Sequence, residues 1–277
     1  MIPCVRRFLL ALACSASLAS AQSTNPPSGV LLTGYDLSLI GGATLASVAL
    51  FRIDTRVARA IADSSLHNRY PGLTRAALRG SIPTETLWML AGGGVYGLAR
   101  LRGDYTTADI AFHTTEAVAS TAMVIQVVRG ALGRARPYVI DDVGETRDAD
   151  PTEFQLFHGF TSFNYRSYPS MHAMASMAVA SALSQEMRLR DTPNRGVISP
   201  LLYAGALIPS AARMYLDEHW TSDIALGIFL GVFAGQKAVL YSHDHPDNRF
   251  DNQFLKPIAH AVVSHDGRGF SFSLTPF

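Results

Sequence analysis

The chain has 277 residues, a formal net charge of +1 and 16% charged residues. A near-neutral chain lacks the basic surface of a nucleic-acid-binding protein, so nucleic acid is excluded as a partner. Soluble domains average about 25% charged residues, so the low charge content indicates either a large helical core or contact with a membrane.

Residues 1–21 have the pattern of a secretory signal peptide. Two arginines precede a short apolar run, residues 8–19, and Ala-Ser-Ala at 19–21 is a small-x-small cleavage pattern. The run is too short to favour a membrane-spanning helix. We therefore predict export to a bacterial periplasm, as a soluble or membrane-associated protein. A lipid anchor at Cys14 is a variant of this prediction.

Both cysteines, Cys4 and Cys14, lie in this leader. The mature chain then has none, which excludes disulfides, a thiolate nucleophile and a cysteine-based zinc site. Removing the leader lowers Lys plus Arg from 23 to 21 against 22 Asp plus Glu, so the net charge changes from +1 to −1. Any recognition of phosphate must therefore be local to a site.

The rest of the chain is predicted to be one helical domain with short flanking segments. Residues 22–33 contain a Pro-Pro break and are interpreted as a linker. Residues 34–245 are predicted to form an all-α bundle of about six core helices, because Ala, Leu, Met and Gly dominate the apolar runs. The predicted helices are 35–51, a shorter one near 54–66, 85–100, 107–132, 171–188, 198–215 and 221–241. Residues 246–277 are predicted to be a tail with a β-hairpin.

The apolar runs are short or interrupted by charged residues and prolines. A membrane span needs about 20 mostly apolar residues, so we predict a soluble exported bundle over a polytopic membrane protein, with membrane contact left open. Residues 138–168 form a long polar segment, which in a compact domain is typical of a functional lid or a disordered loop.

The first stretch with chemical potential is RGALGRARP, Arg129 to Pro137. Arg129 and Arg136 lie two helical turns apart, and the glycines and proline predict that the helix ends here. Two guanidiniums near a helix end suit a phosphate, which each can bind through paired hydrogen bonds. The alternative is ordinary capping of a helix C-terminus by arginines.

The second stretch is SYPSMHA, Ser167 to Ala173. Ser170 is a favoured N-cap residue, so the backbone N–H groups of Met171 and His172 are expected at the positive end of a helix, where an anion binds well. The alternative is that Ser170 only caps the helix and His172 is a polar residue of its first turn.

The third stretch is ARMYLDEHWTSD, Ala212 to Asp223. His219 and Asp223 are four residues apart, so on a helix they share a face. A carboxylate that accepts one ring N–H fixes the tautomer and leaves the other nitrogen as a nucleophile or base. Arg213 is predicted to point into the same space. The alternative is a His–Asp pair on a solvated face.

Together the three stretches resemble the motifs of the type 2 phosphatidic acid phosphatase (PAP2) superfamily, which includes bacterial class A acid phosphatases and vanadium-dependent haloperoxidases. The family pattern is Lys, six residues, Arg-Pro; then Pro-Ser-Gly-His; then Ser-Arg, five residues, His, three residues, Asp. The order and spacings match in this chain. The resemblance implies an all-α bundle and a phosphatase that needs no metal or other cofactor.

The resemblance also implies residue roles. His219 attacks phosphorus and forms a phosphohistidine, Asp223 orients His219, and His172 protonates the leaving oxygen. The phosphoryl oxygens are bound by Arg129, Arg136, Arg213, Ser170 and the Met171 N–H. The implied substrate is a phosphorylated small molecule or lipid, a phosphate monoester or a pyrophosphate.

Three residues depart from the family pattern. Arg129 replaces lysine, Ala212 replaces serine, and Met171 replaces glycine. Methionine keeps the backbone N–H but needs a negative φ, and we expect its side chain at the mouth of the pocket. If Met171 instead blocks the site, the chain is a non-catalytic phosphate- or lipid-binding relative. A vanadium-dependent haloperoxidase is the third alternative.

Two other histidine-containing segments show no pattern that indicates a function. HDHPD, His243 to Asp247, has the look of a metal site but is interpreted as a solvated loop, because no other ligand is evident near it. His113 and Glu116 are interpreted as packed polar residues within a helix.

Overall fold

The computed structural model describes residues 32–61, 64–140 and 146–245. The predicted signal peptide, nearly all of the predicted linker and the predicted C-terminal hairpin lie outside these residues.

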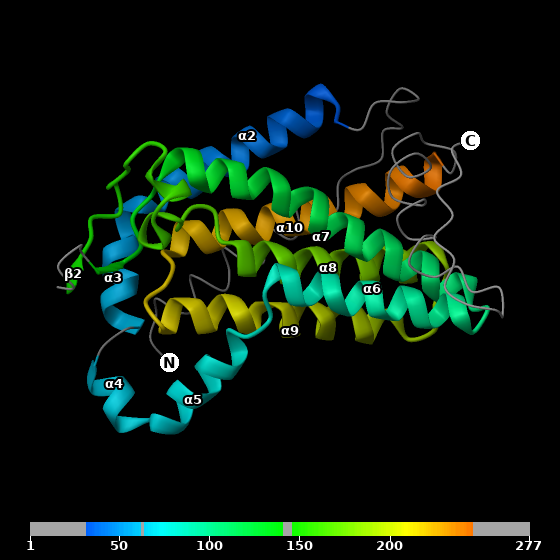
Figure 1. Ribbon diagram of the computed structural model, residues 1–277, viewed down its shortest axis with the longest axis horizontal. Helices are drawn as coiled ribbons and strands as arrows, with labels where there is room; N and C mark the ends of the chain where they lie inside the picture. The colour runs from blue at the N-terminus through cyan, green and yellow to red at the C-terminus, as the bar shows by residue number, and fades with distance from the viewer. Residues whose placement is uncertain (1–31, 62–63, 141–145, 246–277) are drawn as a thin grey trace.

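The described residues form an all-α bundle, as predicted, together with one small sheet that was not predicted (Figure 1). The helices are α2 (Gly34–Ala49), α3 (Phe51–Ile61), α4 (Ser64–Arg69), α5 (Pro71–Gly80), α6 (Glu85–Leu101), α7 (Tyr105–Leu132), α8 (Met171–Leu189), α9 (Arg195–Tyr215) and α10 (Thr221–Asp244). Helix α8 lies at the centre and packs against α6, α7, α9 and α10. The predicted core helices are all present, with ends shifted by at most a few residues.

Helix α7 ends where the glycines of the first motif predict. Gly133 follows its last residue with φ +59°, the left-handed conformation that glycine adopts without strain. A Cβ atom at this position would lie 1.7 Å from the carbonyl oxygen of Gln155, so only glycine fits. The turn directs the chain from Arg134 to Pro137 back across the end of the bundle.

Helices α8 and α10 approach each other closely because α10 carries Gly227, Gly231 and Gly235 along one face. A Cβ atom at Gly227 would lie 2.5 Å from the carbonyl oxygen of Ser170, and one at Gly231 would lie 2.3 Å from that of Met174. Any larger residue would push the helices apart. This packing places the first turn of α8 beside the first turn of α10.

The segment between α3 and α6 differs from the prediction. The predicted helix near 54–66 ends at Ile61, and two further helices, α4 and α5, follow. The Pro71-Gly72 pair has the composition of a turn, but Pro71 is the first residue of α5. Proline is well tolerated at that position, since its missing N–H has no partner within a helix.

The polar segment 138–168 is folded over one end of the bundle in its described part. Strand β1 (Tyr138–Ile140) pairs antiparallel with β2 (Thr146–Asp148), and the 3-10 helices η2 (His158–Phe160) and η3 (Phe163–Tyr165) follow. The carbonyl of Ala131 and that of Gly133 accept backbone hydrogen bonds from this segment, at 2.8 Å each. Disorder is therefore the wrong expectation for these residues.

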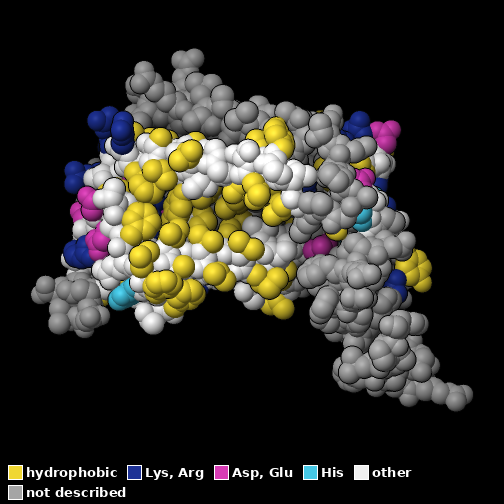
Figure 2. Space-filling view, turned by 90° about the horizontal axis from the view of Figure 1, so that it is seen from above, with side chains coloured by type: hydrophobic (Ala, Val, Ile, Leu, Met, Phe, Trp, Pro, Cys, Tyr) yellow, Lys and Arg dark blue, Asp and Glu magenta, His cyan; other side chains and the backbone are white. Residues whose placement is uncertain are grey.

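The surface of the bundle carries many apolar side chains. Figure 2 shows them gathered over the middle of one face, with charged side chains mostly towards the two ends. Helices α9 and α10, of 21 and 24 residues, are each long and apolar enough to cross a membrane. The α2–α3 pair, bent by 58°, passes the same test as one unit. The prediction of a soluble bundle rested on short apolar runs, and these helices remove that reason. They are compatible with membrane association.

Candidate active site

The tertiary structure brings the three predicted motifs together at one end of the bundle. They lie at the end of α7 and just beyond it, at the start of α8, and from the end of α9 to the start of α10. Seven of the eight predicted site residues are buried, namely Arg129, Arg136, Ser170, Met171, Arg213, His219 and Asp223. The eighth, His172, is partly buried.

The two histidines and the three arginines share one electrostatic environment. Burial lowers the pKa of His219 well below its ordinary value, and the charges of Arg136, Arg213 and Arg129 lower it further. Burial and the same three arginines lower the pKa of His172 to about 3. Both rings are therefore neutral at physiological pH when no anion is bound.

His172 is also held by a part of the chain that the sequence did not identify. Its side chain makes a hydrogen bond to the backbone of Ser81, which raises its pKa slightly against the larger effects of burial and charge. Ser81 is the C-cap residue of α5. The unpredicted helix α5 thus supplies one contact of the site.

The histidine–aspartate pair predicted from the third motif is present. Nδ1 of His219 lies 3.4 Å from Oδ2 of Asp223. That oxygen also accepts hydrogen bonds from Oγ of Ser167 at 2.5 Å and from the backbone N–H of Trp220 at 2.8 Å. Among the described residues, Nδ1 of His219 has no hydrogen-bond partner, so a small rotation of the ring is needed to complete the bond to Asp223.

Two of the three arginines have hydrogen-bond donors that no described residue accepts. Nε of Arg129 and Nε of Arg213 are buried and have no partner in the described part of the chain. Burial lowers the pKa of Arg129 to about 10 and that of Arg136 to about 9, so both remain charged at neutral pH. Buried guanidinium groups with open donors are satisfied best by an oxyanion, which can accept several charge-assisted hydrogen bonds at once.

Comparison with known families agrees with this geometry. Residues 111–247 match the family model described as the PAP2 superfamily, and this range contains all three motifs. The chain belongs to the PAP2 superfamily. No curated protein and no solved structure matches the chain. The residues of the PAP2 site that depart from the family motifs, or that the motifs do not contain, are therefore judged from their contacts in this structure.

Met171, the main departure from the PAP2 motif, does not lie at the mouth of the pocket, and that expectation is wrong. It is the first residue of α8, and its φ is not positive. Its side chain is 1% exposed and packs in a core cluster with Val118 and Ile125 of α7. The side chain points into the bundle because the first turn of α8 faces α7. The N–H group remains at the start of the helix.

Ser170 caps α8 as predicted. Its Oγ accepts a long hydrogen bond from the N–H of Ala173, at 3.5 Å, and its own N–H donates to the carbonyl of Asp223 at 3.0 Å. The second contact joins the helix starts that carry His172 and Asp223. The first N–H groups of α8 have no partner within the helix and form an anion-binding end.

Arg134 is a buried residue of the candidate site that the motif pattern did not single out. It is fully buried and donates to Oδ2 of Asp54 at 2.9 Å, to Oδ1 of Asp223 at 2.5 Å and to Oγ of Ser222 at 2.7 Å. Its guanidinium also lies 3.9 Å from the centre of the Phe51 ring. Every nitrogen of this side chain has a partner, since Nε donates to a carbonyl oxygen at 2.8 Å. Arg134 thus holds Asp223 in place from behind.

Glu218 is a second residue that sequence reasoning missed, although it precedes His219 directly. Its Oε2 accepts hydrogen bonds from Arg136 and from Arg213, the latter at 2.9 Å. Its side chain is 31% exposed, so it reaches the site from the solvent side. A carboxylate that bridges two guanidiniums makes the contacts expected of a phosphoryl oxygen. Motif spacing gave no signal of this, because the position is unspecified in the pattern.

Arg166 adds a further positive charge beside Arg129. Its Nε is buried without a partner among the described residues, and another nitrogen donates to Oε1 of Gln126. After burial, the charge of Arg166 is the largest influence that lowers the pKa of Arg129. The cationic site is therefore wider than the three motif arginines.

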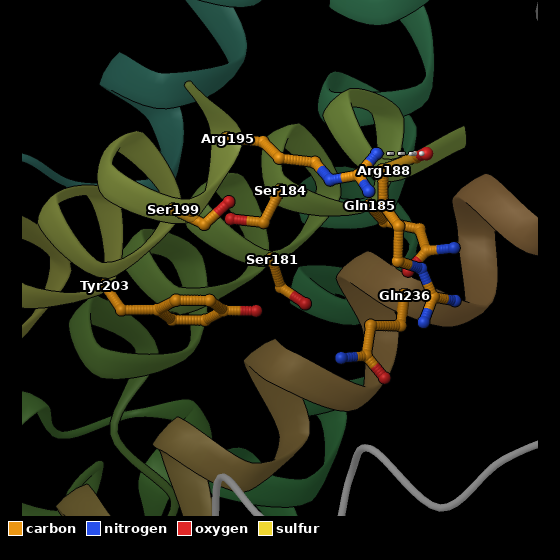
Figure 3. A pocket seen from close by; sticks show the side chains of 9 residues that line it. Ser181, Ser184, Gln185, Arg188, Arg195, Ser199, Tyr203 and Gln236 are labelled. Atoms are coloured by element: carbon orange, nitrogen blue, oxygen red, sulfur yellow. Dashed lines mark hydrogen bonds between the residues drawn. The ribbon is translucent and has the colours of Figure 1, made fainter. Parts of the chain in front are cut away.

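A separate pocket of about 270 Å³ lies between α8, α9 and α10 (Figure 3). It is lined by polar residues such as Ser184 and Gln236, and at its rim Arg195 donates to the carbonyl of Arg188 at 3.4 Å. None of the predicted PAP2 site residues lines it. The active site is located by converging charge and hydrogen-bond donors, not by the volume of a cavity.

Proposed function

We propose that the protein is an exported PAP2 phosphatase that hydrolyses phosphate monoesters through a phosphohistidine intermediate on His219. The observation that carries the proposal is the juxtaposition of a neutral, buried His219 with three buried guanidinium groups, two of which have unpaired Nε donors. Phosphoryl transfer depends mainly on positioning and on charge neutralisation, and this site supplies both without a metal in the reaction.

In the first step, Nε2 of His219 attacks phosphorus. The N–P bond forms as the bond from phosphorus to the leaving oxygen breaks, and the positive charge on the ring is stabilised by Asp223. The arginines and the first N–H groups of α8 bind the three remaining phosphoryl oxygens, where negative charge gathers.

His172 is proposed as the proton donor to the leaving oxygen. Its pKa of about 3 in the free site is too low for this role. The charges of three arginines contribute to this low pKa. A bound phosphoryl dianion offsets those charges, so the pKa of His172 rises when substrate binds. In the second step the ring of His172, neutral after it has given up its proton, takes a proton from water. The water oxygen attacks phosphorus, and the N–P bond to His219 breaks to release phosphate.

The substrate class favoured by the surroundings is a phosphate carried on an apolar group. Phe163 is 62% exposed and lies over Arg136, with 4.0 Å between the guanidinium carbon and the ring centre. An apolar leaving group can contact this ring while its phosphate reaches the arginines. The apolar surface of the bundle and the length of α9 and α10 support a lipid phosphate or lipid pyrophosphate.

The test compares wild type with His219→Ala on p-nitrophenyl phosphate and on phosphatidic acid in detergent micelles. We expect turnover of at least one substrate by wild type and loss of it in the variant. His158→Ala is the matched control, because this histidine is exposed and its ring lies 4.6 Å from that of Tyr165, outside the motifs. Rapid quenching of the wild type is expected to trap an acid-labile phosphoryl group on His219.

Equal activity in wild type and His219→Ala would contradict the proposal. The non-catalytic alternative rested on a Met171 side chain between the two histidines, and its burial against α7 removes that reason. The same assay still tests it, since a binding-only protein would bind phosphate without turnover.

A further inference from the structure

A second cluster of ionisable side chains lies at the opposite end of α10 from the active site. His113 of α7, Glu186 of α8 and His243 of α10 present ligand atoms that all lie within 4.8 Å of one another. We propose that these three residues bind a divalent first-row transition-metal ion such as Zn²⁺. The proposal does not rest on the phosphatase function.

The ligand atoms of the cluster lie close enough together for one metal ion to bind all three. Nδ1 of His113 lies 2.6 Å from Oε1 of Glu186, and Nε2 of His243 lies 3.1 Å from the same oxygen. Two imidazole nitrogens and one carboxylate oxygen are a common donor set for Zn²⁺, with bonds of about 2.0–2.2 Å. Ligand atoms of a tetrahedral site lie about 3.3 Å apart by that geometry, so movements below 1 Å open the space for an ion.

The carboxylate is held in place for this role. Glu186 is fully buried, and its Oε2 accepts a hydrogen bond from Nε of Arg190 at 2.8 Å. Oε1 is close to both histidines, and Nε2 of His243 also lies 3.2 Å from Oε2. A fixed ligand orientation of this kind is what outer contacts provide in metal sites. Burying the carboxylate of Glu186 in the bundle costs free energy unless charged or hydrogen-bonding partners offset it.

An entry path is also present. The side chain of His243 is 32% exposed, whereas that of His113 is 14% exposed and that of Glu186 is 1% exposed. The cluster thus opens to solvent on the His243 side, where the fourth coordination position is left to water. The earlier interpretation of His243 as part of a solvated loop is wrong, because α10 continues to Asp244.

The cluster is too far from the phosphoryl site to take part in catalysis. Asp223 and His243 are 20 residues apart on α10, which at 1.5 Å per residue corresponds to about 30 Å. A metal ion here joins α7, α8 and α10 at the far end of the bundle. Its expected effect is on stability, since an ion that binds only the folded state raises the free energy of unfolding, by an amount that grows with the logarithm of the free ion concentration relative to Kd.

The competing explanation is a set of hydrogen bonds without metal, in which both histidines donate to Glu186. The experiment uses the full chain purified without a polyhistidine tag, and the probe is Zn²⁺ alone. Bound zinc is counted by mass spectrometry after dialysis, and the melting temperature is measured with and without zinc. Co²⁺ provides a third readout, because a tetrahedral site with nitrogen ligands has a strong visible absorption.

We expect one zinc per wild-type chain and a zinc-dependent rise in melting temperature. His243→Asn and His113→Asn are each expected to weaken binding at least tenfold, while His158→Asn, an exposed histidine outside the cluster, retains it. His243 is partly exposed, so its variant is the one least affected in folding. A wild type that takes up no zinc, or cluster variants that bind it as well as wild type, would overturn the proposal. Lower stability of the variants without any zinc effect identifies the hydrogen-bond network instead.

Discussion

Two kinds of buried arginine occur within the nine residues from Arg129 to Pro137. Arg134 has every nitrogen paired, with two carboxylates, a hydroxyl and a carbonyl as partners. Arg129 is also buried, yet its Nε has no partner in the described part of the chain. Both are guanidiniums in one motif, so residue type and burial do not separate them.

The difference in pairing indicates different roles. A saturated guanidinium has its desolvation cost offset by fixed protein partners, so it is expected to serve stability. One with open donors is left for a ligand. Arg134 is therefore expected to hold the fold of the site, while Arg129 is expected to bind substrate.

The largest expected effect is on stability, from Arg134→Met. Loss of this guanidinium leaves Asp54, whose pKa is already raised by burial, without its charged partner. We expect the free energy of unfolding to fall by about 3–5 kcal/mol in chemical denaturation. The double variant Arg134→Met/Asp54→Asn is expected to recover part of the loss. If Arg134→Met alone is as stable as wild type, Arg134 does not have the stabilising role that distinguishes it from Arg129.

The next effect is on catalysis, from Arg129→Met. We expect kcat/KM to fall about 100- to 1000-fold, as for the loss of one donor to a developing oxyanion, with unfolding changed by less than about 1 kcal/mol. Arg129→Lys restores the lysine of the PAP2 pattern and is expected to keep most of the activity. If Arg129→Met unfolds as readily as Arg134→Met, the two arginines do not differ in role.

Met171 provides an intermediate case, because it lies in a motif but packs as a core residue. Met171→Gly is expected to lower the free energy of unfolding by about 2–4 kcal/mol through the cavity it leaves. Met171→Leu, which keeps the volume, is expected to cost less than about 1.5 kcal/mol. Activity per folded molecule is expected to stay similar on both substrates. A broader substrate range for Met171→Gly would show instead that this side chain reaches the pocket.

Glu218→Gln tests the carboxylate that pairs with the substrate-binding arginines. The amide loses the charge that competes with phosphate for Arg136 and Arg213, so we expect vanadate or phosphate to bind about tenfold more tightly, or about 1.4 kcal/mol. Calorimetric titration measures this. Glu153→Gln, which breaks an ion pair with Arg147 outside the site, is the matched control. Weaker binding in Glu218→Gln would mean that this carboxylate positions the arginines.

The smallest effect is the pH dependence of stability due to His172. The unfolded side chain has a pKa near 6.5 and the folded one about 3, so the unfolded state binds more protons in this window. The contribution of His172 therefore leaves the free energy of unfolding unchanged above about pH 6.5 and lowers it as the pH falls towards 3. Between pH 8 and pH 6 we expect wild type to lose about 0.5–1 kcal/mol more than His172→Gln in denaturation experiments. Parallel profiles would contradict the low pKa.

The sequence by itself determined the helices and the order of the motifs. Long runs of Ala, Leu, Met and Gly predicted the core helices, and Ser170 and Gly133 predicted where α8 starts and α7 ends, because caps and glycine turns act locally. The motif spacings predicted which histidines, arginines and aspartate lie in the candidate site, since each motif lies at or between helix ends.

The tertiary structure decided what those side chains contact. The pairing of Arg134 with Asp54 joins residues 80 positions apart, and the bridging of Arg136 by Glu218 joins residues 82 positions apart. Helix α5 and its contact with His172 were not predicted from the sequence. Likewise, the side chain of Met171 lies in the core because α7 packs beside the first turn of α8. His243 contacts Glu186 because the glycines of α10 allow that helix to pack closely against α8. Contacts between helices depend on packing at long sequence separation, and no local pattern encodes them.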